Sequence, residues 1–463
     1  MSSRIDERLK DLRGASRRDF IKWSGVLAAA IGLERSKYLD VLNDTAGSAL
    51  ADTAGQRATA FSIFWMEGNG GLSNLQLLFP QTRVATGNNP AYPFHAMGKA
   101  IKVQGTTKEM HVAPEMAPVL ASAKTPFTAF LCGRNETHTG APQSAANLGG
   151  AGSLLANAAA IQQKVPTLLP VITVGNIAFG TAAGAPAPAV VANAGGMVDL
   201  FNSNASKTLL STPKNAGLSE AYYKAFLNLN AAAGRATMTR GQDIGKVSMN
   251  LLGKNLSDQL RPTQDDLKLF GLGTGVPNAI VNMGQATITA LKAFRLGLSS
   301  GVVISGQRND PHQMFANGDA QATLVAKSMA DVLNGMFTMA KSLSDPGSTN
   351  KSILDSLVWA VYGDTTKSFT NRQGWPDGTA GGANMLIAYG AGYLKTGWFG
   401  NLSATADNQV DGWDPATGNT APYNADMQGQ TASAAVCYAI AKGDLRAVPT
   451  RNDMGGITNT VVI

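Results

Sequence analysis

Short apolar runs alternate with longer helical segments, and this alternation restricts the chain to one class of fold. The runs have the length and composition of buried strands, and they are Phe61–Met66, Phe127–Cys132, Val302–Ser305, Leu357–Tyr362 and Met385–Tyr389. Such an order is typical of crossover units on a mainly parallel sheet. We predict one α/β domain with helices on both faces of the sheet, in which residues 302–305 and 357–362 form neighbouring or near-neighbouring strands.

Two segments between these strands have the apolar spacing of amphipathic helices, residues 281–298 and 321–342. In the second, one face collects Leu324, Met329, Val332, Leu333 and Met336. We interpret these methionines as core residues, since they keep helical spacing. Residues 166–196 are rich in Ala, Gly, Pro and Val. They predict a strand followed by a loop at the sheet edge.

The N-terminal segment predicts export rather than a folded element. Arg17 and Arg18 precede the apolar run 23–33, which is too short to span a bilayer. Residues 16–22, "SRRDFIK", resemble the twin-arginine signal, whose route carries folded proteins. Small residues at 49–51 offer a cleavage site, and an uncleaved anchor remains open. We predict a signal segment over 1–51, a domain over 52–463, and a periplasmic or extracellular location.

Charge and cysteine count exclude some functions. After residue 51 the chain keeps 29 basic and 24 acidic residues, a net charge of +5, with no basic run. We therefore expect no nucleic-acid partner, and no membrane span in the mature chain. Only two cysteines occur, Cys132 and Cys437, so a zinc site built on Cys is excluded and a disulfide between them stays open.

Polar residues follow two of the predicted strands. Asp310 and His312 come after the strand 302–305, and Asp364 follows the strand 357–362. Ligands in open α/β sheets bind at the carboxyl ends of strands, and carboxylate and imidazole suit zinc, manganese or iron. Asp310 and His312 are also compatible with a hydrogen-bonded loop pair or with acid–base chemistry, and Asp364 with a turn cap.

The order of these elements resembles that of the twin-arginine-exported domain-of-unknown-function family 1501, which has an alkaline-phosphatase- and sulfatase-like fold. The resemblance covers residues 280–410 and, more loosely, 60–150. Its G-W-D-T-H, G-E-F-G-R-T-P and D-H-W-P motifs correspond to residues 306–312, 363–367 and 374–376. It implies a metal site formed by Asp310, His312 and Asp364, with His138 as a further candidate from the segment 132–150.

Several positions depart from the family pattern. The family motif G-G-P-S-H-L-D corresponds to residues 70–76, where amides at Asn74 and Gln76 replace two ligands, and Gly374 replaces the histidine of D-H-W-P. A two-metal site needs about six protein ligands, and this chain has four histidines. We predict a non-catalytic, exported binding or assembly component, with a surface protein or glycan as partner. The alternative is a phosphate or sulfate ester hydrolase with a reduced, single-metal site.

Overall fold

The computed structural model describes the larger part of the chain after the predicted signal. The described residues are 58–79, 99–102, 109–116, 119, 127–136, 141–202, 217, 220, 221, 223–225, 255–348, 350–368, 374–376, 383–402, 410–449 and 462. The signal segment 1–51 and His138 lie outside them. The predictions made for these two therefore stay predictions as far as the structure is concerned.

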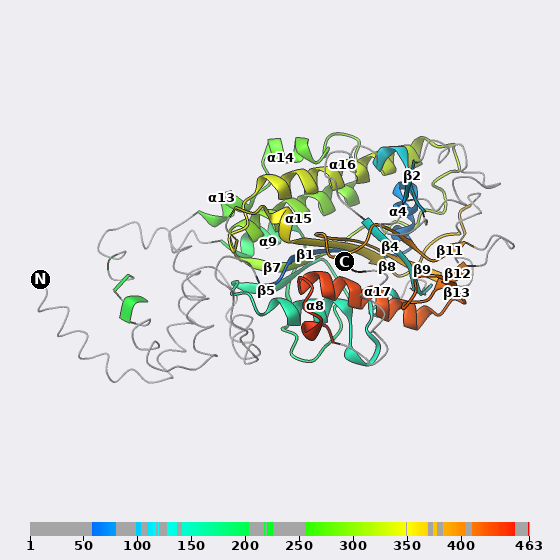
Figure 1. The fold of residues 1–463 in the computed structure, drawn as a ribbon. Coiled ribbons are helices and arrows are strands. Elements are labelled where there is room, and N and C mark those ends of the chain that lie inside the picture. The colour runs from blue at the N-terminus through cyan, green and yellow to red at the C-terminus, as the bar shows by residue number, and fades with distance from the viewer. Residues whose placement is uncertain are drawn as a thin grey trace, which may run out of the picture.

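A sheet of eight strands forms the middle layer of the described residues (Figure 1), in the order β10-β4-β9-β8-β1-β7-β5-β6. Only β9 runs against its neighbours β4 and β8; the other pairs are parallel. This confirms a mainly parallel α/β fold. The strands are β1 (Phe61–Glu67), β4 (Phe127–Arg134), β5 (Leu169–Val174), β6 (Ala189–Val191), β7 (Ser299–Ser305), β8 (Leu357–Gly363), β9 (Ala383–Gly390) and β10 (Gly397–Phe399).

Two small antiparallel sheets lie outside this layer. One pairs β2 (Lys99–Lys102) with β3 (Glu109–Val112). The other joins β11 (Asn401–Leu402), β12 (Val410–Trp413) and β13 (Thr420–Ala421).

Helices cover both faces of the large sheet, as predicted (Figure 1). The helices α15 (Asn278–Arg295) and α16 (Ala320–Ser342) pack on one face, with α4 (Leu75–Leu78), α9 (Ala194–Leu200), α13 (Leu256–Leu260) and α14 (Gln264–Leu269). The helices α8 (Leu154–Gln162) and α17 (Ala425–Ile440) pack on the other face. Each face therefore has its own hydrophobic cluster.

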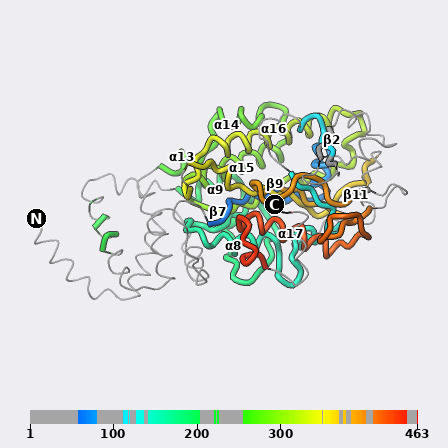
Figure 2. Tube along the Cα trace, in the orientation of Figure 1, coloured from blue at the N-terminus to red at the C-terminus, as the bar shows by residue number. Residues whose placement is uncertain are grey.

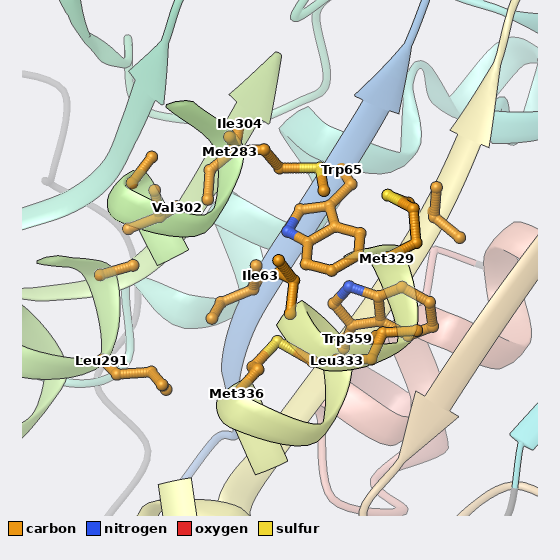
Figure 3. Packing of buried hydrophobic residues seen from close by; sticks show 14 of the residues in the cluster. Ile63, Trp65, Met283, Leu291, Val302, Ile304, Met329, Leu333, Met336 and Trp359 are labelled. Atoms are coloured by element: carbon orange, nitrogen blue, oxygen red, sulfur yellow. The ribbon is translucent and has the colours of Figure 1, made fainter. Parts of the chain in front are cut away.

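The central strand β1 divides its side chains between the two clusters. Ile63 and Trp65 enter the cluster under α15 and α16, whereas Phe64 and Met66 enter the cluster under α8 and α17. This follows from the two-residue period of a strand. Figure 3 shows Trp65 beside Trp359 of β8, and their rings meet edge-on with centroids 5.1 Å apart. In Figure 2 the blue trace of β1 lies in the interior, among segments from later in the chain.

The predicted helices and strands agree with the structure apart from some details. β7 begins at Ser299, earlier than predicted, because the buried Ser299 hydroxyl donates to the carbonyl of Gly301 and the polar residue can enter the strand. Leu324 was predicted to face the core with Met329, but it is 43% exposed. It lies in the first turns of α16, where the buried positions are Val325 and Ala326. The strands β7 and β8 flank β1, so they are near neighbours as predicted.

The cysteine pair left open by the sequence is not a disulfide in the structure. Cys132 in β4 and Cys437 in α17 are both free and buried. Burial raises the pKa of each thiol, that of Cys437 to about 12. Both cysteines are therefore neutral core residues.

Candidate functional site

The predicted site residues lie at the carboxyl edge of the central strands. β1, β7 and β8 are parallel neighbours, so the loops that follow them meet at one edge of the sheet. These loops contain residues 68–74, 306–312 and 364–368. The edge is therefore the place where this fold class binds ligands.

Asp364 is held by the backbone of the loop after β1. Its Oδ2 accepts from the amide of Asn69 at 2.9 Å, and its Oδ1 from the amide of Gly70 at 3.3 Å. Asn69 and Gly70 have φ values of 52° and 76°, and consecutive left-handed residues turn their amides toward one point. This concave arrangement of amides commonly binds anions, and here it binds a carboxylate of the same chain. The sequence suggested that Asp364 caps its own segment 364–368; these two bonds instead join it to the turn after β1.

A buried lysine joins Asp310 to His312. The side chain of Lys367 is completely buried, and its Nζ lies 2.6 Å from Asp310 Oδ1 and 3.0 Å from His312 Nε2. Asp310 Oδ2 lies 3.2 Å from the same imidazole nitrogen. The structure thus brings Asp310 and His312 together as predicted, around a positively charged group that sequence reasoning did not single out.

The backbone sets the tautomer of His312. Its Nδ1 lies 2.9 Å from the carbonyl oxygen of Gly374, which can only accept. Nδ1 therefore carries a proton, and Nε2 faces both Lys367 Nζ at 3.0 Å and Asp310 Oδ2 at 3.2 Å. Trp375 keeps this segment in place, because its buried indole donates to the carbonyl of Ser368 at 3.0 Å and packs on Phe315.

Gly70 is required at its position for two reasons. Its φ of 76° belongs to the left-handed region that favours glycine. A Cβ there would also lie 2.9 Å from Cε of Lys367. The same residue therefore lends its amide to Asp364 and leaves room for the aliphatic chain of Lys367.

Glu67, the last residue of β1, is a further acidic group at this edge. It is fully buried, and it accepts a hydrogen bond from the amide of Gln307. Its Oε1 has no hydrogen-bond partner among the described residues, and a Cβ at Gly306 would collide with that atom. Burial, with a smaller contribution from the charge of Asp364, raises the pKa of Glu67 to about 8. The carboxyl is therefore largely protonated at neutral pH.

The sequence carried a signal for Glu67, an acidic residue at the end of a fully apolar run, but it was not selected as a site residue. Lys367 carried a weaker signal. A lysine after a strand is ordinarily solvent-exposed, whereas the buried Lys367 is paired with Asp310 and contacts His312.

Asn74 and Gln76, after β1, form internal hydrogen bonds. Asn74 donates to Gln307 Oε1 at 3.0 Å, and Gln76 donates to the carbonyl of Lys367 at 3.1 Å. Ser73 accepts from the amide of Lys367 at 2.6 Å. These side chains thus connect the loop after β1 to the loops after β7 and β8.

The described side chains do not fit a bound metal ion. Within the described ranges, no group of three or more His, Cys, Asp and Glu residues could hold one. The ammonium of Lys367 binds both Asp310 and His312, which are also in contact with each other, and Asp364 binds backbone amides. His138, the fourth predicted ligand, lies outside the described residues. No catalytic step through a metal follows from this geometry.

Comparison with known proteins identifies the N-terminal segment. Residues 14–33 match the family model of the twin-arginine translocation (TAT) pathway signal sequence. The chain carries a twin-arginine signal. This finding supports export by the twin-arginine route, to the periplasm or beyond. The match ends before the α/β fold begins, so the resemblance to family 1501 and to alkaline phosphatases gains no support from it.

Neither the curated proteins nor the solved structures include a match to this chain. Among the helices that the structure describes, none combines the length and the hydrophobicity needed to cross a membrane. The site must therefore be interpreted from its own geometry.

Proposed function

We propose that this exported protein is a non-catalytic binding or assembly component of the periplasm or cell surface, built on one α/β domain over residues 52–463. Its partner in this proposal is a surface protein or a glycan. The twin-arginine signal supports the location. The absence of a catalytic role is argued from the carboxyl edge of the sheet.

One observation carries the proposal: the charged groups at this edge bind one another. The ammonium of Lys367 binds Asp310 and His312, and the carboxylate of Asp364 accepts from the amides of Asn69 and Gly70. A hydrolase needs such groups directed at its substrate, because catalysis requires interactions with the transition state. Here they are satisfied within the protein.

The first experiment measures ester hydrolysis by the purified protein. The exported, signal-free protein is purified and incubated with p-nitrophenyl phosphate and p-nitrophenyl sulfate, with and without Mg²⁺, Mn²⁺ or Zn²⁺. We expect no release of nitrophenol above that of the buffer. Hydrolysis that is lost in the double variant Asp310→Ala, His312→Ala would instead establish the alternative, an ester hydrolase with a reduced site.

A binding or assembly role also predicts an association at the cell envelope. After chemical cross-linking of intact cells, we expect the protein to appear in a defined higher-mass species or on purified envelope glycan. Replacement of Arg17 and Arg18 by Lys should abolish both by retaining the protein in the cytoplasm. An exported protein that stays entirely monomeric and unattached would contradict the role.

A further inference from the structure

We propose that β6, the last strand at one edge of the large sheet, is the contact through which two copies of this chain pair. In this pairing the two β6 strands run antiparallel about a two-fold axis at Val190. The inference concerns self-association and does not depend on the partner proposed above. It rests on the backbone of Val190, on the exposure of this residue and on the absence of charge in the surrounding segment.

The two edges of the large sheet differ in how well they are covered. The sheet ends in β10 on one side and in β6 on the other. All three residues of β10 are buried. In β6 only Ala189 is buried, and Val190 is 53% exposed, more than any other large hydrophobic residue that the structure describes. The sheet is therefore open at β6.

Val190 directs its backbone polar groups away from the sheet. β6 is parallel to β5, and the amide of Gly175, just after β5, donates to the carbonyl of Val191 at 2.8 Å. Because alternate residues of a strand bond to a given parallel neighbour, Ala189 and Val191 face β5 and Val190 faces outward. Among the described residues, neither the N–H nor the C=O of Val190 has a hydrogen-bond partner.

A second copy of the chain satisfies both groups at once. Across a two-fold axis at Val190 the strands are antiparallel, and Val190 lies opposite the same residue of the other copy. Two residues that face each other in this way exchange both N–H···O bonds. The contact is also closed, because each copy uses the same surface and no edge is left to add a third chain.

The segment around β6 is free of charge. No Asp, Glu, Lys or Arg occurs between Lys164 and Asp199, a stretch of 34 residues in which the chain's 15% charged content would place about five. Natural proteins commonly protect an open strand edge with charged side chains, and none is present here. A surface that meets its own copy must avoid like charges directly opposite each other. The absence of charge therefore favours a second copy over a partner that is recognised by charge.

Two substitutions at Val190 test the pairing in the signal-free full chain by sedimentation velocity over a range of protein concentrations. We expect the wild type to form a dimer. Val190→Pro removes the outward N–H and leaves the bonds to β5 intact, since proline is tolerated on an edge strand where its nitrogen faces solvent. Val190→Lys places two like charges opposite each other at the axis. Both variants should sediment as monomers.

A matched control makes the same change at a distant exposed residue. Met427 is 37% exposed in α17, where the neighbouring Asp426 pairs with Arg134 of β4, toward the other side of the sheet. Met427→Lys should therefore remain a dimer.

A cysteine at the axis locates the contact directly. The Cα atoms of a hydrogen-bonded antiparallel pair lie about 5.5 Å apart, within the range that a disulfide spans. Both native cysteines are buried, so Val190→Cys supplies the reactive thiol. With diamide as the oxidant, which takes up the two electrons and two protons of the paired thiols, we expect a covalent dimer. Met427→Cys should give none.

Several results would overturn the proposal. A wild type that stays monomeric up to about 100 μM has no such contact. A dimer that persists in Val190→Lys, or that Val190→Cys does not cross-link, uses another surface. If Val190→Pro does not fold, Val190→Lys decides, because it changes an exposed side chain and keeps the backbone. The measurements use purified protein alone, so their failure differs from ester hydrolysis by the wild type, which would overturn only the proposed function.

Discussion

Glu67 is expected to make the folded protein less stable as the pH rises toward 8. Burial, together with the charge of Asp364, raises the pKa of Glu67 from 4.5 to about 8, against the opposing hydrogen bond from the amide of Gln307. Between these values the folded protein keeps a proton that the unfolded chain has released. The stability linked to this proton is fully present below the unfolded pKa and is lost as the pH rises through the folded pKa.

The size of the effect follows from this shift. One pKa unit corresponds to about 1.36 kcal/mol, so the free energy of unfolding should fall by about 2.5 kcal/mol from roughly pH 5.5 to roughly pH 7.5 through Glu67 alone. The variant Glu67→Gln does not titrate, and its amide oxygen still accepts from Gln307. Urea unfolding of both proteins at several pH values gives the difference between their profiles.

The comparison isolates Glu67 from the other acids. Burial also raises the pKa of Glu115 and of Glu136, but both residues remain in the variant and cancel in the difference. Asp319→Asn, at an exposed position before α16, serves as the matched control and should keep the wild-type profile. Parallel profiles for wild type and Glu67→Gln over this range would refute the assignment of a raised pKa.

Three further changes test the packing. Cys132 and Cys437 should resist a thiol-specific reagent such as DTNB until the protein is unfolded, because both thiols are buried and neutral; labelling of the native protein would contradict their burial. The amide of Gln162 donates at 2.9 Å to two backbone carbonyls at the starts of β1 and β7. Gln162→Ala should therefore lower the free energy of unfolding, measured in urea, by roughly 2–4 kcal/mol. A loss below about 0.5 kcal/mol would show that these bonds are dispensable. Ala391 has a φ of 45° in a turn before a glycine, a left-handed conformation that asparagine adopts more readily than alanine. Ala391→Asn should therefore stabilise the folded protein by about 0.5–1 kcal/mol and raise its melting temperature. A lower melting temperature would count against the turn.

The sequence predicted those elements that have strong local patterns. The strands β1, β4, β8 and β9 and the end of β7 consist mostly of apolar residues, and α15 and α16 have apolar residues at helical spacing. The helix α17 was missed because its buried residues are mostly small, as in "TASAAVCYAI", and its polar and apolar faces hardly differ. The antiparallel direction of β9 could not be predicted either, since the pattern of a buried strand is the same in both directions.

The candidate site was predictable only in its position. Strand order places Asp310, His312 and Asp364 at one edge, which follows from the general geometry of parallel sheets. Their partners depend on tertiary contacts that no local pattern encodes. The amides of Asn69 and Gly70 bind Asp364 from almost 300 residues away in the sequence, and the buried Lys367 is paired with Asp310 from a different loop.

The position of β1 in the sheet also has a consequence for the timing of synthesis. β1 is the first strand of the large sheet after the export signal, yet its partners β7 and β8 are made much later: Ser62 pairs with Gly301 and with Val358. At about 5–20 residues per second, a ribosome needs roughly 15–60 s to make the intervening chain. The signal is therefore complete long before the central strand can pair on either side. Ribosomes that stop before β8 would release chains that carry the signal but have an unpaired edge at β1, so a transport route that accepts folded proteins can distinguish them from finished molecules.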